Sequence, residues 1–159
     1  WTPAVWNQNK ASFNAKNNTT VTGMQYKAAE GFTLAFQNGW EKEAYTNGKI
    51  WQVATLRPGK YRLEVTYAYT MVVSDAGNFI SALMAKGNSE SDIPNVADIE
   101  QLNGVCAIYD KAGTNDDSGV LVTPSFEVTE TTDVVIGFLT SLAKGNSYFK
   151  VTELKLILE

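Results

Sequence analysis

A strict alternation of apolar and polar side chains runs from Tyr61 to Met71. Successive side chains of a β-strand point to opposite faces of the sheet, so a repeat of two residues buries one set and exposes the other. The apolar set is Tyr61, Leu63, Val65, Tyr67, Tyr69 and Met71, and the alternate set is Arg62, Glu64, Thr66, Ala68 and Thr70. The segment is therefore predicted to be a long strand with one face in the core.

A second alternation runs from Val120 to Val128, with Pro124 inside it. Proline has no backbone N–H to donate to a neighbouring strand, so Pro124 predicts an edge strand. Shorter apolar runs predict further strands over residues 21–26, 32–36, 50–56, 79–85 and 134–139. Eight or nine strands are expected in all, with the tight turn Arg57–Lys60 between two of them.

In the last apolar stretch, residues 149–158, the apolar residues shift from odd-numbered to even-numbered positions. Phe149 and Val151 share one parity, whereas Leu154 and the following leucines share the other. A shift of one residue turns side chains to the opposite face unless the strand bulges, so a β-bulge is predicted near Thr152 and Glu153. One short helix is expected from Ser91 to Leu102, where a polar cap and Pro94 precede apolar residues at three-residue spacing.

The length of 159 residues suits one domain, and we expect residues 1–159 to form it, with residues 1–18 as a loosely packed lead-in. The net charge is −4 and Lys and Arg are scattered, which argues against a nucleic-acid partner. The longest apolar runs are far shorter than the roughly 20 residues of a membrane-spanning helix. Cys106 is the only cysteine, so an internal disulfide is excluded.

These patterns predict an all-β fold, a two-sheet antiparallel sandwich with one short helix. The expected core consists of residues at inward-facing positions of these strands, and Trp51 is expected to be buried as well. Its members are Tyr61, Leu63, Val65, Tyr67, Phe126, Val128, Ile136 and Phe138.

Several of these segments resemble galactose-binding-like jelly rolls. The resemblance rests on Ile50-Trp51-Gln52, the turn Arg57–Lys60 with its long strand, residues 135–138, and the closing segment from Tyr148 to Leu154. More narrowly, the chain is similar to C-terminal domains of unknown function in surface lipoproteins of gut Bacteroidetes. The resemblance covers roughly residues 30–159, and it implies an extracellular or cell-surface location as part of a lipid-anchored protein.

Catalysis is not expected, and no catalytic residue is assigned. The chain has no histidine, which excludes Ser-His-Asp, Cys-His and His-ligated metal sites. A glycosidase needs only two carboxylates, and that alternative stays open. Its candidates are Glu41, Glu43, Asp110, Asp116 and Asp117.

No metal or other cofactor is predicted, although the segment from Asp110 to Gly119 is rich in Asp and Asn. A solvated turn, a calcium site and a sugar-binding loop are the three readings of this segment. The resemblance implies a structural calcium held partly by an acidic residue in the closing strand. Thr152 occupies that position here, with Glu153 only adjacent, and this departs from the family pattern.

Aromatic residues among hydrogen-bonding side chains point to sugar binding, because a sugar ring stacks its C–H face on Trp or Tyr. The turn-rich segment 37–48 combines both kinds of side chain. Trp40 is expected to be either an exposed stacking platform or a buried plug of the sandwich. The predicted ligand-binding residues are Trp40, Glu41, Tyr45, Asn47, Tyr109 and Asp110.

Two functions from different classes remain. The first is a non-catalytic carbohydrate-binding module of a surface glycan-utilisation protein, whose ligand is a glycan. The alternative is a structural or assembly module that docks other domains of the same lipoprotein and has no ligand of its own.

Overall fold

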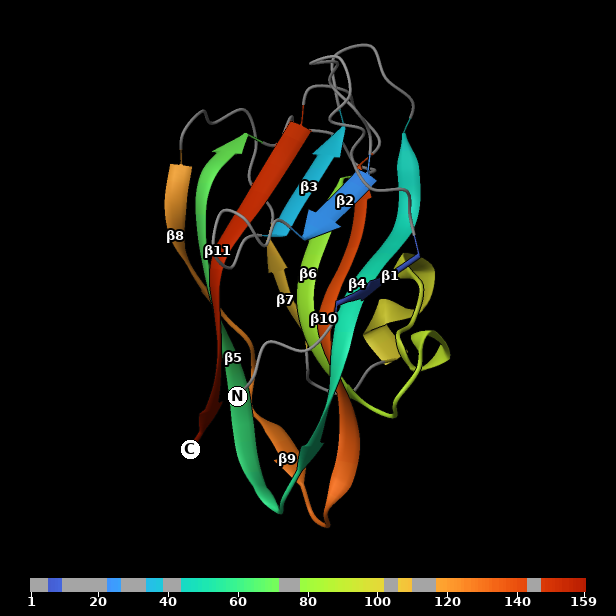
Figure 1. The fold of residues 1–159 in the computed structure, drawn as a ribbon, viewed down its shortest axis with the longest axis vertical. Helices are drawn as coiled ribbons and strands as arrows, with labels where there is room; N and C mark the ends of the chain where they lie inside the picture. Colours follow the sequence, from blue (N-terminus) through green and yellow to red (C-terminus); the bar gives the residue numbers. More distant parts are fainter. Residues whose placement is uncertain are drawn as a thin grey trace.

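The computed structural model describes residues 6–9, 23–26, 34–38, 44–71, 78–101, 106–109, 117–142 and 147–159. Two antiparallel sheets pack face to face, and short 3-10 helices lie on the outer side of one of them (Figure 1). This arrangement confirms the predicted two-sheet antiparallel sandwich.

The first sheet has five strands in the order β1-β4-β10-β6-β7. In that order they are β1 (Asn7–Gln8), β4 (Tyr45–Leu56), β10 (Thr132–Leu142), β6 (Phe79–Lys86) and β7 (Cys106–Tyr109). The second sheet has six strands, with the order β2-β3-β11-β5-β8 and with β9 also paired to β5. They are β2 (Gly23–Tyr26), β3 (Leu34–Asn38), β11 (Ser147–Leu158), β5 (Gly59–Met71), β8 (Asp117–Val122) and β9 (Phe126–Val128).

The predicted core is confirmed in full. All eight residues named from the alternation are buried, as is Trp51, and Leu63 and Val65 have no exposed surface. The eight belong to one cluster between the sheets, the inner cluster, which also includes Ile50, Phe149 and Leu154. The alternation was informative here because one face of the second sheet meets solvent while the other meets the first sheet.

The three central strands of the first sheet, β4, β10 and β6, are buried on both faces. An outer cluster covers the other side of this sheet, where Trp51 and Leu139 pack with Ile93 and Ile99. Ile99 belongs to the second of two 3-10 helices, η1 (Glu90–Asp92) and η2 (Val96–Gln101). The expected short helix from Ser91 to Leu102 is therefore corrected to these two pieces, which Pro94 separates because it has no N–H to continue a helix.

The second alternation forms two strands instead of one. β8 and β9 both pair with β5, at the edge of the second sheet, so the edge position inferred from Pro124 is confirmed. The chain leaves strand geometry at residues 123–125, and the parity changes there. As a result Val120 and Val122 are 58% and 51% exposed, whereas Phe126 and Val128 are buried.

The predicted β-bulge is confirmed. Val151 pairs with Tyr67 and Glu153 with Thr66, so Thr152 is the extra residue on β11. The Thr152 hydroxyl donates a hydrogen bond to the Thr66 carbonyl at 3.4 Å. The bulge lets Val151 and Leu154 both face the inner cluster despite their different parity.

The turn at residues 57–58 joins β4 of the first sheet to β5 of the second. A Cβ at Gly59 would lie 2.7 Å from Leu158 Cδ1, so the start of β5 and the end of β11 are tightly packed. Part of the expected loose lead-in is well packed. Trp6 is buried in the inner cluster, and Asn7 pairs with Trp51. No helix in the described ranges is long and apolar enough to cross a membrane.

Candidate ligand-binding end of the sandwich

The six predicted ligand-binding residues fall into three groups. Trp40, Glu41 and Asp110 lie outside the described residues. Tyr45 and Asn47 lie at the start of β4, and Tyr109 ends β7. The strands that flank the two candidate loops can therefore be placed, although the loops themselves lie outside the described residues.

Strand register in the first sheet brings Tyr45 and Tyr109 to one end. Tyr45 pairs with Leu142 on β10, two residues after Thr140. Thr140 pairs with Ile80 on β6, and Ile80 pairs with Tyr109 on β7. The start of β4 and the end of β7 therefore lie at the same end of the sheet, separated by β10 and β6.

In the second sheet, the strand ends next to the same two segments lie at this end of the sandwich as well (Figure 1). Asn38, which ends β3, pairs with Ser147 at the start of β11. Thr70 near the end of β5 pairs with Asp117 at the start of β8. The strands that flank residues 39–43 and residues 110–116 thus end and begin at one end of the sandwich, which we call the loop end. Asp117, Ser118 and Gly119, expected in the acidic loop, belong to β8 instead, because they continue the ladder with β5.

Tyr45 is buried beneath the loop end. Its side chain is 8% exposed and belongs to the inner cluster. Its hydroxyl lies 3.0 Å from Thr140 Oγ1, which donates in turn to the Gly48 carbonyl, so Tyr45 is the donor of that pair. Burial raises the pKa of the Tyr45 phenol above its ordinary value. Tyr45, one of the predicted ligand-binding residues, is therefore a buried residue of the domain.

Asn47 joins three parts of the chain. It has a left-handed φ of 51°, a conformation that Asn tolerates better than most residues. Its N–H donates to Ser141 Oγ at 2.9 Å, and its side-chain Oδ1 accepts the Val96 N–H at 2.9 Å. Its carbonyl accepts from Asn9 Nδ2 at 3.1 Å. Asn47 therefore fastens η2 to β4 through its side chain and the N-terminal segment through its backbone carbonyl.

Asn9 extends this fastening, although no pattern in the sequence marks it. Its Oδ1 accepts the Lys49 N–H at 2.8 Å, and its Nδ2 also donates to Glu90 Oε1 at 2.9 Å. An isolated Asn beside β1 carries no periodic signal, so its role could not be found without the strand pairing. Together Asn9 and Asn47 tie β1, β4, β10 and η2 into one unit below the loop end.

Lys49 and Gln52 are two buried polar side chains of β4 that sequence patterning also missed. Lys49 is 7% exposed, and its Nζ donates to the Ile93 carbonyl at 2.6 Å, which holds the segment between η1 and η2 against the sheet. Gln52 is 2% exposed, and among the described residues its Oε1 has no hydrogen-bond partner.

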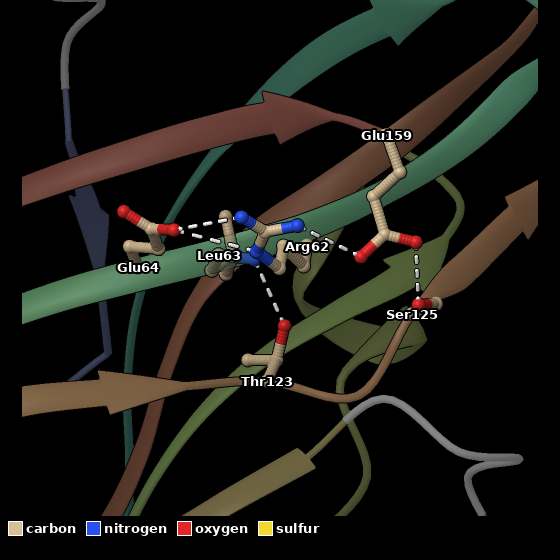
Figure 2. Close-up of polar contacts among 6 residues, drawn as sticks. All are labelled: Arg62, Leu63, Glu64, Thr123, Ser125 and Glu159. Carbon is tan, nitrogen blue, oxygen red and sulfur yellow. Dashed lines mark hydrogen bonds and ion pairs between the residues drawn. The ribbon is translucent and has the colours of Figure 1, made fainter.

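A charged cluster lies on the second sheet, where Arg62 bridges Glu64 and Glu159, each at 3.0 Å (Figure 2). Ser125 also donates to Glu159 at 2.7 Å, and the Ser125 and Arg62 bonds lower the pKa of the Glu159 carboxyl. Arg62 pairs with Ile157 near the end of β11, so the cluster lies away from the loop end. Exposed ion pairs of this kind contribute roughly 0–1 kcal/mol each.

Across the described ranges, no three His, Cys, Asp or Glu side chains are grouped so that they could hold a metal ion. Of the five carboxylates considered for glycosidase chemistry, Glu41, Glu43, Asp110 and Asp116 lie outside the described residues. The described part of the loop end is a scaffold of buried and hydrogen-bonded side chains.

The fold is that of a β-sandwich domain. The chain matches the family described as Domain of unknown function (DUF5013) over residues 1–137, and it belongs to that family. No curated protein matches the chain. The family match ends at Gly137, inside β10, whereas β11 lies at the centre of the second sheet, so the folded unit described here includes residues beyond the match.

Proposed function

We propose that this domain is a non-catalytic carbohydrate-binding module that takes a glycan at the loop end. The observation that carries the proposal is the register of the two sheets. Tyr45, Tyr109, Asn38 and Asp117 flank the two candidate loops, and all four lie at one end of the sandwich. Two segments far apart in the sequence can therefore contribute to one binding surface.

The scaffold under the loops supports binding because it is held from several directions. Tyr45 is fixed by the bond to Thr140, and Asn47 by bonds to Ser141 and Val96. Ligand-binding loops commonly sit on a rigid scaffold of this kind, and a rigid support reduces the ordering cost of binding. Tyr45 itself acts as part of that support and not as a ligand contact.

The binding chemistry is assigned to the loop residues. Trp40 supplies a stacking face for a sugar ring, and Glu41 and Asp110 supply acceptors for its hydroxyl groups. Tyr109, the last residue of β7, is the second aromatic of the site. The resemblance to galactose-binding-like jelly rolls and to Bacteroidetes surface lipoproteins supports an extracellular, lipid-anchored context with a glycan as the ligand.

A structural or assembly module is the second candidate. It is favoured by the use of Tyr45 and Asn47, two of the predicted binding residues, in contacts within the domain. Under this alternative Trp40 is a further packed residue, and the loop end docks other domains of the same protein.

A glycan array probed with the purified 159-residue domain tests the proposal. We expect binding to a restricted set of oligosaccharides and background turnover of chromogenic glycosides. An array with no bound glycan at high protein concentration would favour the structural module. Glycoside turnover that is lost on Glu41→Gln or Asp110→Asn would show that the domain is an enzyme.

A further inference from the structure

β8 is an edge strand of the second sheet. It pairs with β5 on one side, and among the described residues no strand pairs with its other side. A free strand edge presents a row of backbone N–H and C=O groups that can pair with another chain.

The hydrogen bonds of Thr123 show which residues of β8 face that free edge. The Thr123 N–H donates to the Leu63 carbonyl at 3.0 Å, so Thr123 points its backbone toward β5. Backbone groups alternate in direction along an antiparallel strand. Val122 and Val120 therefore direct their N–H and C=O groups away from β5, toward the free edge.

The same two residues carry exposed apolar side chains. Val120 is 58% and Val122 is 51% exposed, and they lie on the outer face of the sheet beside Thr66 and Glu64. With Leu158 they are the exposed large hydrophobic residues of the described part of the chain. A charged side chain is one device by which natural edge strands prevent pairing, and β8 has none after Asp117.

Charge indicates which partner fits this edge. Residues 118–126 include no charged residue, although the chain as a whole has a net charge of −4. Glu64, the carboxylate across from Val122, is already held by Arg62 at 3.0 Å. A charged peptide finds no free counter-charge along this strand, whereas two copies of the acidic chain meet here without opposing like charges.

We infer that β8 pairs antiparallel with β8 of a second copy, which joins the two second sheets into one continuous sheet. In the register that pairs Val120 with the second copy's Val122, both residues exchange hydrogen bonds and four valine side chains meet on one face. Asp117 then lies opposite Ser125 of the other copy, so no acidic pair is formed. Pro124, which cannot donate, limits the paired segment at its far end.

Sedimentation velocity over a concentration series tests this inference, which does not rest on glycan binding. The double variant Val120→Lys with Val122→Lys adds repelling charges at two exposed sites. Its matched control is Thr129→Lys with Thr131→Lys, which adds the same charge at exposed turn residues away from β8. Val122→Pro removes one outward N–H and leaves the ladder with β5 in place.

The expected result is a dimer whose population rises with concentration for the wild type and for the Thr129/Thr131 control. The Val120/Val122 lysine variant and Val122→Pro should each weaken association at least about tenfold, with unchanged circular dichroism. A wild type that stays monomeric up to about 1 mM would overturn the inference. Dimerisation of equal strength in the Val120/Val122 lysine variant would overturn it as well.

Discussion

Thr123 and Leu63 exchange two hydrogen bonds, and one of them uses a side chain in place of the backbone. The Thr123 N–H donates to the Leu63 carbonyl at 3.0 Å, while the Leu63 N–H donates to Thr123 Oγ1 at 2.9 Å (Figure 2). Thr123 is 3% exposed, so this acceptor is shielded from water. The hydroxyl thus keeps a buried donor of β5 satisfied where the edge strand breaks between β8 and β9.

Thr123→Val should destabilise the domain by about 1–3 kcal/mol, because it leaves the buried Leu63 N–H without an acceptor. Thr123→Ser keeps the hydroxyl and should cost clearly less. Urea denaturation of the two variants measures the difference. A smaller loss for Thr123→Val than for Thr123→Ser would show that the methyl group, and not the hydrogen bond, matters at this position.

This break shows where sequence patterning fails. The alternation from Val120 to Val128 is continuous in the sequence, and Pro124 marks an edge position there but does not indicate that the side chains change faces at Thr123. The acceptor role depends on Leu63, sixty residues earlier in the chain. The burial of Tyr45 could not be predicted for the same reason. Its partner Thr140 is 95 residues away, and the residues around Tyr45 in the sequence are typical of a turn.

Sequence patterning predicted the structure correctly where a strand has one buried face and one exposed face. The Tyr61–Met71 alternation predicted β5, since inward and outward residues of this sheet differ in polarity. The change of parity between Val151 and Leu154 predicted the bulge at Thr152. For the candidate site, no local sequence pattern can reveal that the strands flanking the two loops share one end. That relationship comes from the strand register of the structure.

Asn47 should be sensitive to backbone conformation as well as to its side chain. Asn47→Gly loses the bond to the Val96 N–H but keeps the left-handed φ at little cost, so we expect a loss of about 1 kcal/mol. Asn47→Ala adds the strain of that φ, a further 1–2 kcal/mol or so. Thermal melts of both variants test the order. An alanine variant as stable as the glycine variant would contradict the strain argument.

The raised pKa of the Tyr45 phenol predicts a loss of stability in alkali. Below its ordinary value of 10.0 both the folded and the unfolded chain hold the proton. As pH rises above that value the unfolded chain releases the proton and the folded chain retains it, so the free energy of unfolding falls. The slope for this one group reaches about 1.4 kcal/mol per pH unit.

Tyr45→Phe removes this contribution. Urea denaturation between about pH 9 and 11 should therefore show a shallower fall for the variant than for the wild type. Parallel curves would show that the phenol of Tyr45 titrates in the folded state as it does in the unfolded chain.

Gly137 has no room for a side chain. A Cβ there would lie 2.8 Å from Trp51 Cα and would overlap the Ile50 carbonyl oxygen, so the β4–β10 ladder would have to shift. Gly137→Ala should lower stability by about 1–3 kcal/mol or more. Thr131→Ala, at an exposed turn residue, serves as the control and should stay within about 0.5 kcal/mol. A melting temperature unchanged by Gly137→Ala would show that the two strands separate easily.

The glycan-binding proposal depends most on Trp40. Isothermal titration calorimetry with an oligosaccharide selected on the array should show binding by the wild type. Trp40→Ala should weaken that binding about tenfold or more through loss of the stacking face, while stability stays within about 1 kcal/mol. Unchanged affinity in Trp40→Ala, or a loss of about 3–5 kcal/mol in stability typical of a buried tryptophan, would contradict this account.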